Sequence, residues 1–531
     1  MLNALRTASL AACSLLLTSA AIAQNAAPPA ADAGAPGAPD DAARAKLLAA
    51  GAPATTPPGT LTALEKYIKA DDGAFKWSLE KSQHLDQPAP GTWNLLRMTS
   101  QTWRTPGEVD IPEWTHWVHV WVPDALRSDK PILFITGGRR KPDAPDAPAG
   151  ELGFLSRAGA IAVVVDNIPN QPLKLGDDPA ERTEDGLVAR TWVKAMETGD
   201  PTWIARFPMV KGAVKAMDAA TQFLAQHPPT HSTLNGKALD ASFKPGKWLV
   251  AGASKRGWTT WLTAAVDDRV GALAPIVIDV LDVPAQMHHH RAAYGFWAPA
   301  LNDYVETKIV ERLDPTTADP DPLMAGVLAH DDPVNWLSRV SDKPKYLINA
   351  SGDEFFLPDS SSIYEKRLPE PWFLRYVPNS GHNVSRSDAP ANLVAFYLAW
   401  SEGRQMPKIT WNIELPDNEG RSQRAKIHAQ TTIKPSWVRI WRVTTPKKRD
   451  FRIEETKDTW NAGHVGAADK DGLAYEAPVQ IPDKGFTAAF LEFTYKADKP
   501  GDPDLVFTTR VFVLPDRLRY EHGPVPAMPA K

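Results

Sequence analysis

Three side chains of the types that perform nucleophilic catalysis each follow a short apolar run of the sequence. Ser254 comes after WLVAGA, Asp353 after YLINASG, and His382 after WFLRYVPNSG. A serine hydroxyl becomes nucleophilic when a histidine takes its proton and a carboxylate orients that histidine. Because the carboxyl ends of parallel strands meet at one edge of a sheet, the chain order Ser, Asp, His predicts a catalytic triad of these three residues.

The turn at Ser254 has the composition of a nucleophile elbow, in which a strand turns sharply into a helix and presents the serine side chain. The usual spacing is G-x-S-x-G, whereas residues 252–257 read GASKRG, with the second glycine one place late. Small residues tolerate the strained backbone of such a turn. Because any strand-to-helix turn favours Gly, Ala and Ser, helix capping is the alternative role of Ser254.

Other carboxylates could serve as the acid of the triad. Glu354 and Asp359 share the loop of Asp353, and Asp282 follows the preceding strand, where some hydrolases keep their acid. Asp353 is favoured because it stands just beyond its strand. For Asp359 the favoured role is capping of the helix that follows.

Backbone N–H groups near Ser254 could stabilise the negative charge that develops on a substrate carbonyl oxygen. One donor would be the N–H of Lys255, and the other an N–H near Gly137 and Gly138, because glycine lets the backbone approach that charge. A tight turn is the alternative role of the glycine pair.

Two cations, Lys255 and Arg256, lie in the first turn of the predicted elbow helix, where the helix dipole disfavours each by about 0.3–1 kcal/mol. Ion pairs with acidic residues of an insertion, such as Glu184 or Asp185, would offset that cost. The sharper hypothesis makes Arg256 a substrate-binding residue that meets a carboxylate or phosphate with its bidentate fork. It predicts a preference for anionic esters.

The elements that would position these residues alternate between strands and helices, which predicts an α/β fold with a mostly parallel sheet and helices on both faces. The expected strands are 75–79, 93–103, 114–122, 131–136, 160–166, 248–251, 275–280, 345–349 and 373–377, and the expected helices are 61–70, 210–226 and 257–267. The first three strands form an antiparallel lead-in. Insertions near 173–209 and 284–342 follow strand carboxyl ends, where loops build a binding crevice.

A second domain is predicted after Arg404, where the pattern of the sequence changes. Residues 408–531 offer short extended runs separated by Pro, Gly and Asp, with little helical periodicity. Several strands at this spacing are typical of an all-β, immunoglobulin-like sandwich. The first domain is therefore expected to span 61–404.

Composition excludes several classes of partner. With 43% hydrophobic and 23% charged residues, the 531-residue chain is ordinary for a soluble globular protein. A formal charge of −4 and the lack of a long Lys/Arg run give no attraction to nucleic acid or to an anionic membrane. We therefore expect a small-molecule, glycan or peptide substrate.

The amino terminus predicts export to the periplasm or the medium. Residues 1–23 have a short basic region, an apolar stretch and an AIA cleavage pattern, and are too short for a convincing membrane span. Residues 24–60, rich in Ala and Pro, are expected to form a flexible linker. Lipid anchoring at Cys13 is a minor alternative. Cleavage after Ala23 would leave no cysteine, which excludes a Cys nucleophile and Cys-ligated zinc.

A run of three histidines at 288–290 could suggest a metal site. Consecutive residues of a helix point to different faces and cannot all ligate one ion. No metal and no cofactor are therefore expected.

Four segments carry a resemblance to a known family: GASKRGWTTWL, SGDEFFLPDSS, VPNSGHN and RTEDGLVARTWVKAMETGDPTWIARFPMVKGAVKAMDA. They are similar to the PhoPQ-activated pathogenicity-related proteins of PqaA type, over roughly residues 60–520. The resemblance implies an exported α/β-hydrolase with a carboxyl-terminal β domain, tied by name to virulence and antimicrobial-peptide resistance. It maps elbow, acid and base onto Ser254, Asp353 and His382. The elbow is also similar to that of glucuronoyl esterases.

Two functional hypotheses remain. The leading one is an exported serine hydrolase that cleaves an ester or peptide bond through an acyl-enzyme on Ser254. The other is a non-catalytic secreted interaction or signalling protein on a hydrolase scaffold. Three catalytic residue types at three separate strand ends argue against the second, because a binding module does not need them.

Overall fold

The computed structural model describes residues 41–53, 56–57, 59–176, 178–314, 321–416 and 423–521. The chain from Asp40 to Lys531 forms one compact unit. The predicted signal peptide 1–23, with Cys13, and the first part of the predicted linker 24–60 lie outside the described residues.

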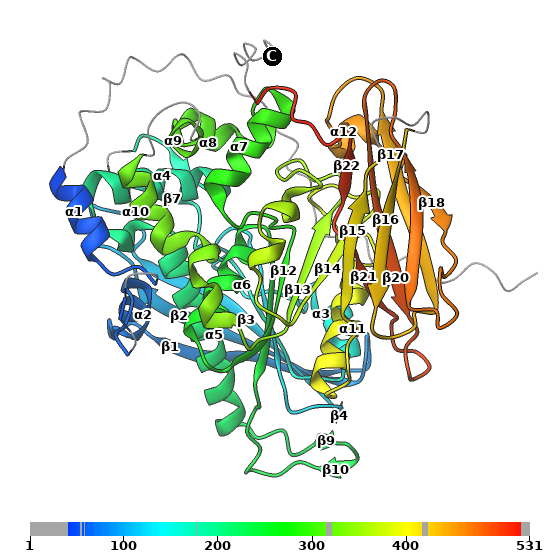
Figure 1. Cartoon of the computed structure of the whole chain (residues 1–531). Helices are drawn as coiled ribbons and strands as arrows, with labels where there is room; N and C mark the ends of the chain where they lie inside the picture. The colour runs from blue at the N-terminus through cyan, green and yellow to red at the C-terminus, as the bar shows by residue number, and fades with distance from the viewer. Residues whose placement is uncertain are drawn as a thin grey trace, which may run out of the picture. The chain divides into compact units, whose positions relative to one another are not determined.

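A nine-stranded sheet lies at the centre of this unit (Figure 1). From one edge to the other it consists of β1 (Lys76–Leu85), β2 (Gly91–Thr102), β3 (Glu113–Pro123), β6 (Ala162–Val165), β5 (Ile132–Ile135), β11 (Trp248–Ala253), β12 (Val270–Ile276), β13 (Lys345–Ala350) and β14 (Trp372–Val377). The first three strands and β6 pair antiparallel, and every pair from β6 to β14 is parallel. This confirms the predicted fold, a mostly parallel sheet with an antiparallel lead-in.

The parallel register brings the ends of the functional strands to one edge of the sheet. Ala253, the last residue of β11, pairs with Ile276 of β12, and Ala350 of β13 pairs with Val377 of β14. The elbow, acid and base loops therefore all leave the sheet at its carboxyl edge, where open α/β sheets bind ligands.

Helices cover both faces of the sheet, and a hydrophobic core lies between the sheet and the helices on each face. On one face lie α5 (Arg206–Gln226) and α6 (Lys255–Val266), and on the other α3 (Leu152–Leu155) and α11 (Ala389–Ser401). Strand β3 shows why: Val118, Val120 and Val122 belong to the first core, whereas Trp117 and Trp121 belong to the second. Successive side chains of this strand therefore point to opposite faces of the sheet.

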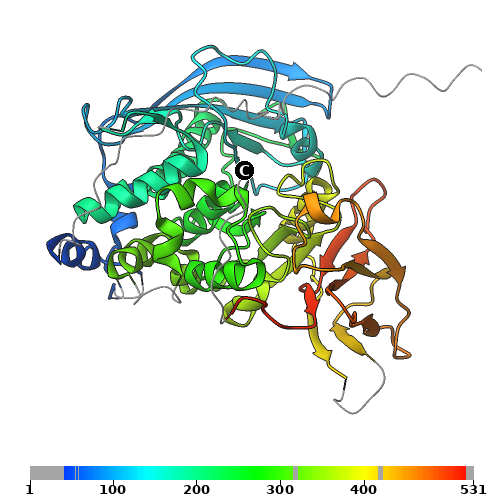
Figure 2. The ribbon, with the colours of Figure 1, turned by 90° about the horizontal axis from the view of Figure 1, so that it is seen from above.

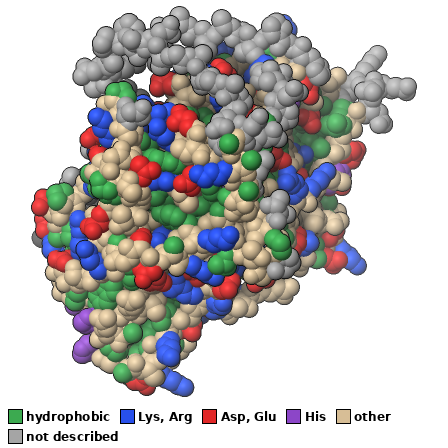
Figure 3. Space-filling view, turned by 90° about the vertical axis from the view of Figure 1, so that its left-hand side faces the viewer, with side chains coloured by type: hydrophobic (Ala, Val, Ile, Leu, Met, Phe, Trp, Pro, Cys, Tyr) green, Lys and Arg blue, Asp and Glu red, His purple; other side chains and the backbone are tan. Residues whose placement is uncertain are grey.

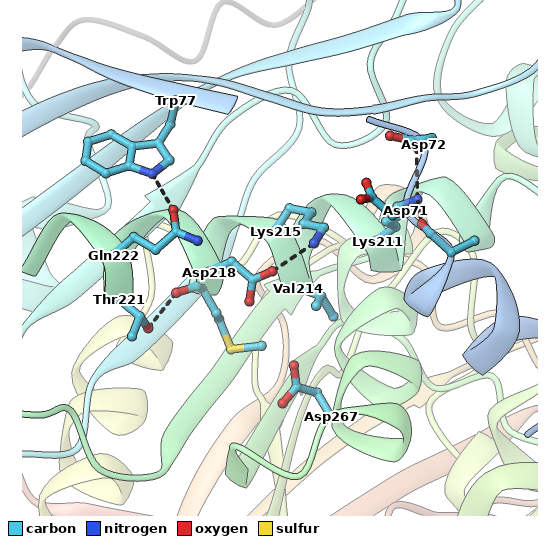
Figure 4. Close-up of polar contacts among 12 residues, drawn as sticks. Asp71, Asp72, Trp77, Lys211, Val214, Lys215, Asp218, Thr221, Gln222 and Asp267 are labelled. Carbon is cyan, nitrogen blue, oxygen red and sulfur yellow. Dashed lines mark hydrogen bonds and ion pairs between the residues drawn. The ribbon is translucent and has the colours of Figure 1, made fainter. Parts of the chain in front are cut away.

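Polar contacts join α5 to the start of the chain's lead-in (Figure 4). The Lys211 ammonium lies 3.0 Å from the Asp72 carboxylate, and the Trp77 indole N–H donates to Gln222 at 2.8 Å. Asp72 lies between α2 (Ala63–Lys69) and β1, so these contacts fix the antiparallel strands against the helical layer.

The two insertions form a cap of short helices beside the carboxyl edge. The first contains β7 (Leu173–Lys174), β8 (Glu181–Arg182) and α4 (Glu184–Thr198), and the second contains α7 (Val283–Tyr294), α8 (Asn302–Glu306), α9 (Ile309–Leu313) and α10 (Pro322–Asp331). Helix α4 contacts both α8 and α10, so the two insertions pack together although they are far apart in sequence (Figures 1 and 2).

The linker predicted for 24–60 is wrong at residues 41–49, which form α1 (Asp41–Ala49) and pack against the cap. The Leu47 side chain is fully buried, and a Cβ on Gly326 of α10 would lie 2.8 Å from it. The Leu47 carbonyl also lies 3.2 Å from His330 Nε2. The sequence DAARAKLLA is a good helix former with one apolar anchor, and this outweighs the flexibility that its Ala content suggested.

The strand predicted at 275–280 is shifted, because β12 ends at Ile276. Val277 has a φ of 43° and turns the chain out of the strand. The true strand begins in the small residues VGALA, and Gly271 leaves room for the Trp400 ring, which a Cβ would approach to 2.9 Å. The prediction placed the strand at 275–280 because β-branched residues favour strands. Ile278 and Val280, however, follow the end of β12.

Antiparallel sheets form the carboxyl-terminal part, as predicted. One contains β15 (Ile409–Glu414), β16 (Arg424–Thr431) and β19 (Ala474–Gln480), and the other contains β17 (Trp437–Thr445), β18 (Asn461–His464), β20 (Phe486–Tyr495), β21 (Leu505–Thr508) and β22 (Phe512–Leu514). They lie beside the β13–β14 side of the main sheet (Figures 1 and 2). Residues 505–514 contain two separate strands, β21 and β22.

Buried polar contacts join the two parts of the molecule. Arg375 of β14 lies 2.7 Å from the Glu492 carboxylate of β20, and both side chains are almost fully buried. The Tyr346 hydroxyl of β13 donates to the Val506 carbonyl at 2.7 Å. The antiparallel sheets are thus packed firmly onto the edge of the main sheet that carries the acid and base loops.

The surface is of mixed charge. On the face shown in Figure 3, basic and acidic side chains are interspersed, in keeping with a formal charge of −4. Among the described residues, no helix has the length and apolar character needed to cross a bilayer.

Candidate active site

Ser254 occupies a strained turn between β11 and α6. Its φ of 58° and ψ of −128° lie where non-glycine residues are rare and where functional residues are often held. The Ser254 N–H donates to the Ile276 carbonyl at 2.8 Å, which ties the turn to the neighbouring strand. The serine side chain makes no capping hydrogen bond, so the alternative of a helix cap is not what the structure shows.

The unusual glycine spacing fits the way α6 leaves the strand. A Cβ on Gly252 would lie 2.8 Å from the Arg256 carbonyl oxygen, and a Cβ on Gly257 would lie 2.9 Å from the Gly252 carbonyl oxygen. Each glycine therefore allows the helix to pass close to the strand's backbone. The late second glycine is a requirement of this elbow.

Asp353 and His382 form a hydrogen-bonded pair. His382 Nδ1 lies 2.9 Å from Asp353 Oδ2 and 3.0 Å from Oδ1. The backbone N–H groups of Phe355 and Phe356 also donate to Asp353 Oδ1, at 2.8 and 3.3 Å. The carboxylate is thus buried and fixed from two sides, and it leaves the other imidazole nitrogen of His382 available.

The environment of His382 favours its protonated form. Burial works to lower the pKa of His382, but the charge of the Asp353 carboxylate and its hydrogen bond outweigh burial and raise the pKa above the usual 6.5. The Phe355 ring packs against the imidazole, with ring centroids 4.5 Å apart. This arrangement stabilises the imidazolium that forms when a histidine takes a proton.

The structure places Ser254 close to this pair without a hydrogen bond from its hydroxyl to His382 among the described residues. Ser254 lines a pocket together with Phe355 and Phe356, and both rings contact His382. Serine, acid and base therefore gather at one edge of the sheet, and the triad assignment stays a prediction. Catalytic hydrogen bonds are often long before substrate binds.

The other carboxylates have different partners. Asp282 caps α7 through the Ala285 N–H at 3.4 Å and pairs with Arg367 at 2.5 Å. Glu354 accepts a hydrogen bond from the backbone N–H of His382 at 2.5 Å and so helps to fix the base loop.

For Asp359 the predicted role of helix cap is wrong. Its side chain caps no helix and instead lies 2.5 Å from Arg449 and 3.1 Å from His289. All three side chains are largely buried, and the Arg449 charge helps to hold the pKa of Asp359 well below its usual value despite burial. This cluster joins the acid loop to α7 and to the antiparallel sheets, which no local sequence pattern could reveal.

A turn of the carboxyl-terminal part touches both the acid and the base loop. The Ile453 N–H, at the start of α12 (Ile453–Thr456), donates to the Gly352 carbonyl at 2.8 Å. The Gly352 N–H in turn donates to the Ser380 carbonyl at 2.9 Å. A Cβ on Gly381 would lie 2.8 Å from the Ile453 side chain. The residues just before Asp353 and His382 are therefore packed on Ile453.

The elbow cations are paired with the first insertion. Lys255 Nζ lies 2.8 Å from Glu184 and 3.1 Å from Asp185. Arg256 holds Glu184 with both terminal nitrogens, at 2.6 and 2.8 Å, and its Nε donates to the Ile168 carbonyl. The alternative of ion pairing is thus what the structure shows, whereas a contact between Arg256 and substrate stays a prediction.

The predicted oxyanion donors lie around this cluster. Lys255 is the first residue of α6, directly after Ser254. Gly137 makes room for Arg256, since a Cβ there would lie 2.1 Å from the guanidinium. Gly138, with a φ of 108°, accepts a hydrogen bond from the Gln171 side chain at 2.9 Å. The glycines therefore have a packing role, and their role as oxyanion donors stays a prediction.

The three histidines of α7 have different surroundings. His288 lies 3.7 Å from Asp314, His289 contacts Asp359, and His290 is buried and accepts from the Ala298 N–H at 3.1 Å. They point to different faces, as predicted for consecutive helical residues.

Sequence reasoning missed a buried carboxyl group just past β12. The Tyr364 and Tyr376 hydroxyls both donate to Asp279, Tyr376 at 2.5 Å. Burial raises the pKa of Asp279 to about 7, against the effect of the two hydroxyls. The two tyrosines are far from Asp279 in sequence, so only the fold reveals the cluster. It fastens the acid loop region to the sheet.

Comparison with known proteins identifies the family. A model of the PhoPQ-activated pathogenicity-related proteins matches residues 64–452. The chain belongs to this family. This member is also 33% identical over 482 residues to autocrine proliferation repressor protein A of Dictyostelium discoideum, which covers 86% of this chain and 92% of that protein. The family predicted from the sequence motifs is confirmed.

Solved structures with some likeness to this family member include esterases and peptidases. Acetyl xylan esterase 1 from Thermoanaerobacterium sp. JW/SL YS485 has 12% identity and a TM-score of 0.40, covering 67% of this chain and 97% of that one. A glucuronoyl esterase from Solibacter usitatus has 14% identity and a TM-score of 0.35, covering 63% and 90%. The strand order and the elbow themselves place this chain among the α/β-hydrolases.

The Glu184 cluster gives a stability prediction. Glu184→Gln removes the negative charge that pairs with both Lys255 and Arg256, whose side chains are nearly buried. We expect the free energy of unfolding at pH 7 to fall by about 1–3 kcal/mol, less than for a fully buried pair because the Glu184 side chain is 39% exposed. Urea denaturation measures this.

The exposed Glu181→Gln is the matched control and should change the free energy of unfolding by under about 0.5 kcal/mol. The two elbow cations hold the pKa of Glu184 well below its usual 4.5. Its stabilisation is therefore fully present above pH 4.5 and is lost as pH falls below it, so the wild type and Glu184→Gln should converge in acid. Equal free energies of unfolding for the wild type and Glu184→Gln at pH 7 would show that this ion pair does not stabilise the fold.

Proposed function

We propose that this protein is a serine hydrolase that cleaves an ester bond through an acyl-enzyme on Ser254. The single observation that carries the proposal is the hydrogen-bonded pair of His382 Nδ1 and Asp353 Oδ2, which are 2.9 Å apart. This pair lies at the same edge of the sheet as the elbow serine. Peptide-bond cleavage by the same residues is the second substrate class, and the assays below include an amide for that reason.

The chemistry follows from the roles that the geometry allows. The Ser254 hydroxyl oxygen attacks the substrate carbonyl carbon, and its proton passes to His382 Nε2 while Asp353 stabilises the imidazolium. The tetrahedral intermediate expels the alcohol, which takes the proton from His382. Water then attacks the acyl-enzyme, gives one proton to His382 and releases the carboxylic acid, as the proton returns to Ser254.

Export is part of the same proposal. Its support is the signal-like pattern of residues 1–23, and amino-terminal sequencing of the mature chain would test it. An exported member of this family would meet its substrate in the periplasm or outside the cell. A part in virulence is supported by the family's name alone, and a part in antimicrobial-peptide resistance stays a prediction.

A non-catalytic signalling role is the second candidate. Its support is the name of the Dictyostelium relative, an autocrine proliferation repressor. A signalling protein would not depend on the Ser254 hydroxyl, whereas a hydrolase does. The two functions are therefore separated by loss of turnover in a variant that still folds.

Substitutions at the three residues test the hydrolase proposal. Turnover of a p-nitrophenyl ester should fall by about 10⁶-fold in Ser254→Ala and by about 10⁴-fold in Asp353→Asn, because the second change misorients the imidazole. Asp282→Asn, at the alternative acid, is the matched control and should stay within a few-fold of wild type. An inactive wild type, or loss in Asp282→Asn in place of Asp353→Asn, would overturn the assignment. A p-nitroanilide in parallel assays reports amide cleavage.

The pH dependence follows from the state of His382. The base must be neutral to take the Ser254 proton, so kcat/KM should fall as pH drops through the raised pKa of His382. The midpoint of the acid limb in the free enzyme should therefore lie above 6.5. A midpoint below 6.5 would contradict the predicted balance between burial and the Asp353 charge.

A further inference from the structure

An apolar pocket opens beside Ser254. It is bounded by α4, α6, the cap helices and the segment that follows β12. Its main apolar lining residues are Trp192, Trp258, Ile278, Val280, Met287 and Leu313. Each of these side chains is at least nine-tenths buried. Trp258 belongs to the first core and also lines the pocket.

The tryptophans present only their apolar surface to this pocket. The Trp192 N–H donates to the Asp331 carboxylate at 2.7 Å, and the Trp258 N–H donates to the Asp331 carbonyl at 2.6 Å. Both indole donors are therefore already engaged by the protein. A ligand that enters meets ring carbons at these two positions.

Each charged side chain of the lining faces an opposite charge of the protein, although the buried Arg206 Nε makes no hydrogen bond among the described residues. Lys255 pairs with Glu184 and Asp185, and Asp185 also accepts from the Tyr304 hydroxyl at 3.0 Å. Arg206 is almost fully buried, and its guanidinium lies over the Trp258 ring, 4.5 Å from the centroid. The Asp331 carboxylate, 4.0 Å away, opposes the Arg206 charge. An anionic ligand would have to compete with carboxylates that the protein supplies.

We propose that this pocket binds an uncharged alkyl or aryl acyl group of the ester, with its carbonyl at Ser254. The inference rests on the proposed serine hydrolase function and names the substrate class of the same site. The acyl chain extends from Ser254 past Trp258 toward Val280 and Met287. The substrate class is therefore esters of medium-length apolar carboxylic acids.

The length of the acyl chain determines how large the expected change in kcat/KM is. Each methylene moved from water into an apolar site contributes about 0.8 kcal/mol, which is about fourfold in affinity when packing is good. An acetyl group is too short to use the pocket, whereas a hexanoyl group carries four more methylenes into it. Allowing for imperfect packing, we expect kcat/KM to rise at least about tenfold from acetate to hexanoate.

The first experiment compares p-nitrophenyl acetate, butyrate and hexanoate with the mono-p-nitrophenyl ester of adipic acid, which has the six-carbon chain with a terminal carboxylate. The account predicts the order hexanoate above butyrate above acetate, and hexanoate at least about tenfold above the adipate ester, because the pocket offers no unopposed cation. Equal rates along the series would overturn the proposal. A preference for the adipate ester, which is what a contact between Arg256 and an anionic substrate predicts, would overturn it as well.

Two variants locate the chain. Val280→Phe fills the pocket and should bring the hexanoate-to-acetate ratio close to one. Met287→Ala widens the pocket and should move the optimum to longer chains, such as octanoate and decanoate. The exposed Leu415→Phe is a control for a general effect of added apolar volume and should keep the wild-type ratio. An unchanged ratio in the folded Val280→Phe protein, or an unchanged optimum in Met287→Ala, would place the chain elsewhere.

A binding measurement separates this proposal from the hydrolase proposal. Titration calorimetry of 2-octanone, a methyl ketone, into Ser254→Ala should show binding with a negative heat-capacity change that Val280→Phe abolishes. If no ester is hydrolysed but the ketone binds in this way, the hydrolase proposal fails and the pocket assignment stands. If esters are hydrolysed at rates that do not depend on chain length and the ketone does not bind, the pocket assignment fails alone.

Discussion

The acid–base pair depends on the packing of Ile453 against two glycines. Gly352 precedes Asp353 and Gly381 precedes His382, and without side chains both come within contact distance of Ile453. The Ile453 N–H also donates to the Gly352 carbonyl. The Arg449–Asp359 ion pair also ties the acid loop to the carboxyl-terminal part. The antiparallel sheets therefore do more than extend the protein, because they fix the loops that hold the acid and the base.

A second constraint is the neutralisation of the elbow cations. Lys255 and Arg256 lie in the first turn of α6, where their charge is unfavourable, and Glu184 binds both. Glu184 begins α4, so the same contact anchors the cap insertion over the sheet edge. Because Lys255 and Arg256 are paired with Glu184, the lining of the pocket beside Ser254 is mainly apolar. The cap thus determines the character of the site as well as its cover.

Much of the frame could be predicted from the sequence because its signals are local. Apolar runs predicted the parallel strands, and small residues predicted the elbow. Asp353 and His382 could be placed because each follows the end of a predicted strand. The roles of Asp359 and Asp279 could not be predicted, because the partners Arg449, Tyr364 and Tyr376 lie 85 to 97 residues away in the sequence. Helix α1 was missed because an Ala-rich segment is equally compatible with a tether and with a helix that one leucine anchors.

The central claim is that Ser254 is an activated nucleophile. Incubation of the full-length mature protein with a fluorophosphonate, followed by intact mass measurement and peptide mapping, tests it most directly. The account predicts one adduct per chain on Ser254, absent in Ser254→Ala and much slower to form in His382→Ala, since the imidazole takes the serine proton. A folded wild-type protein that stays unlabelled, or an adduct on another residue, would contradict it.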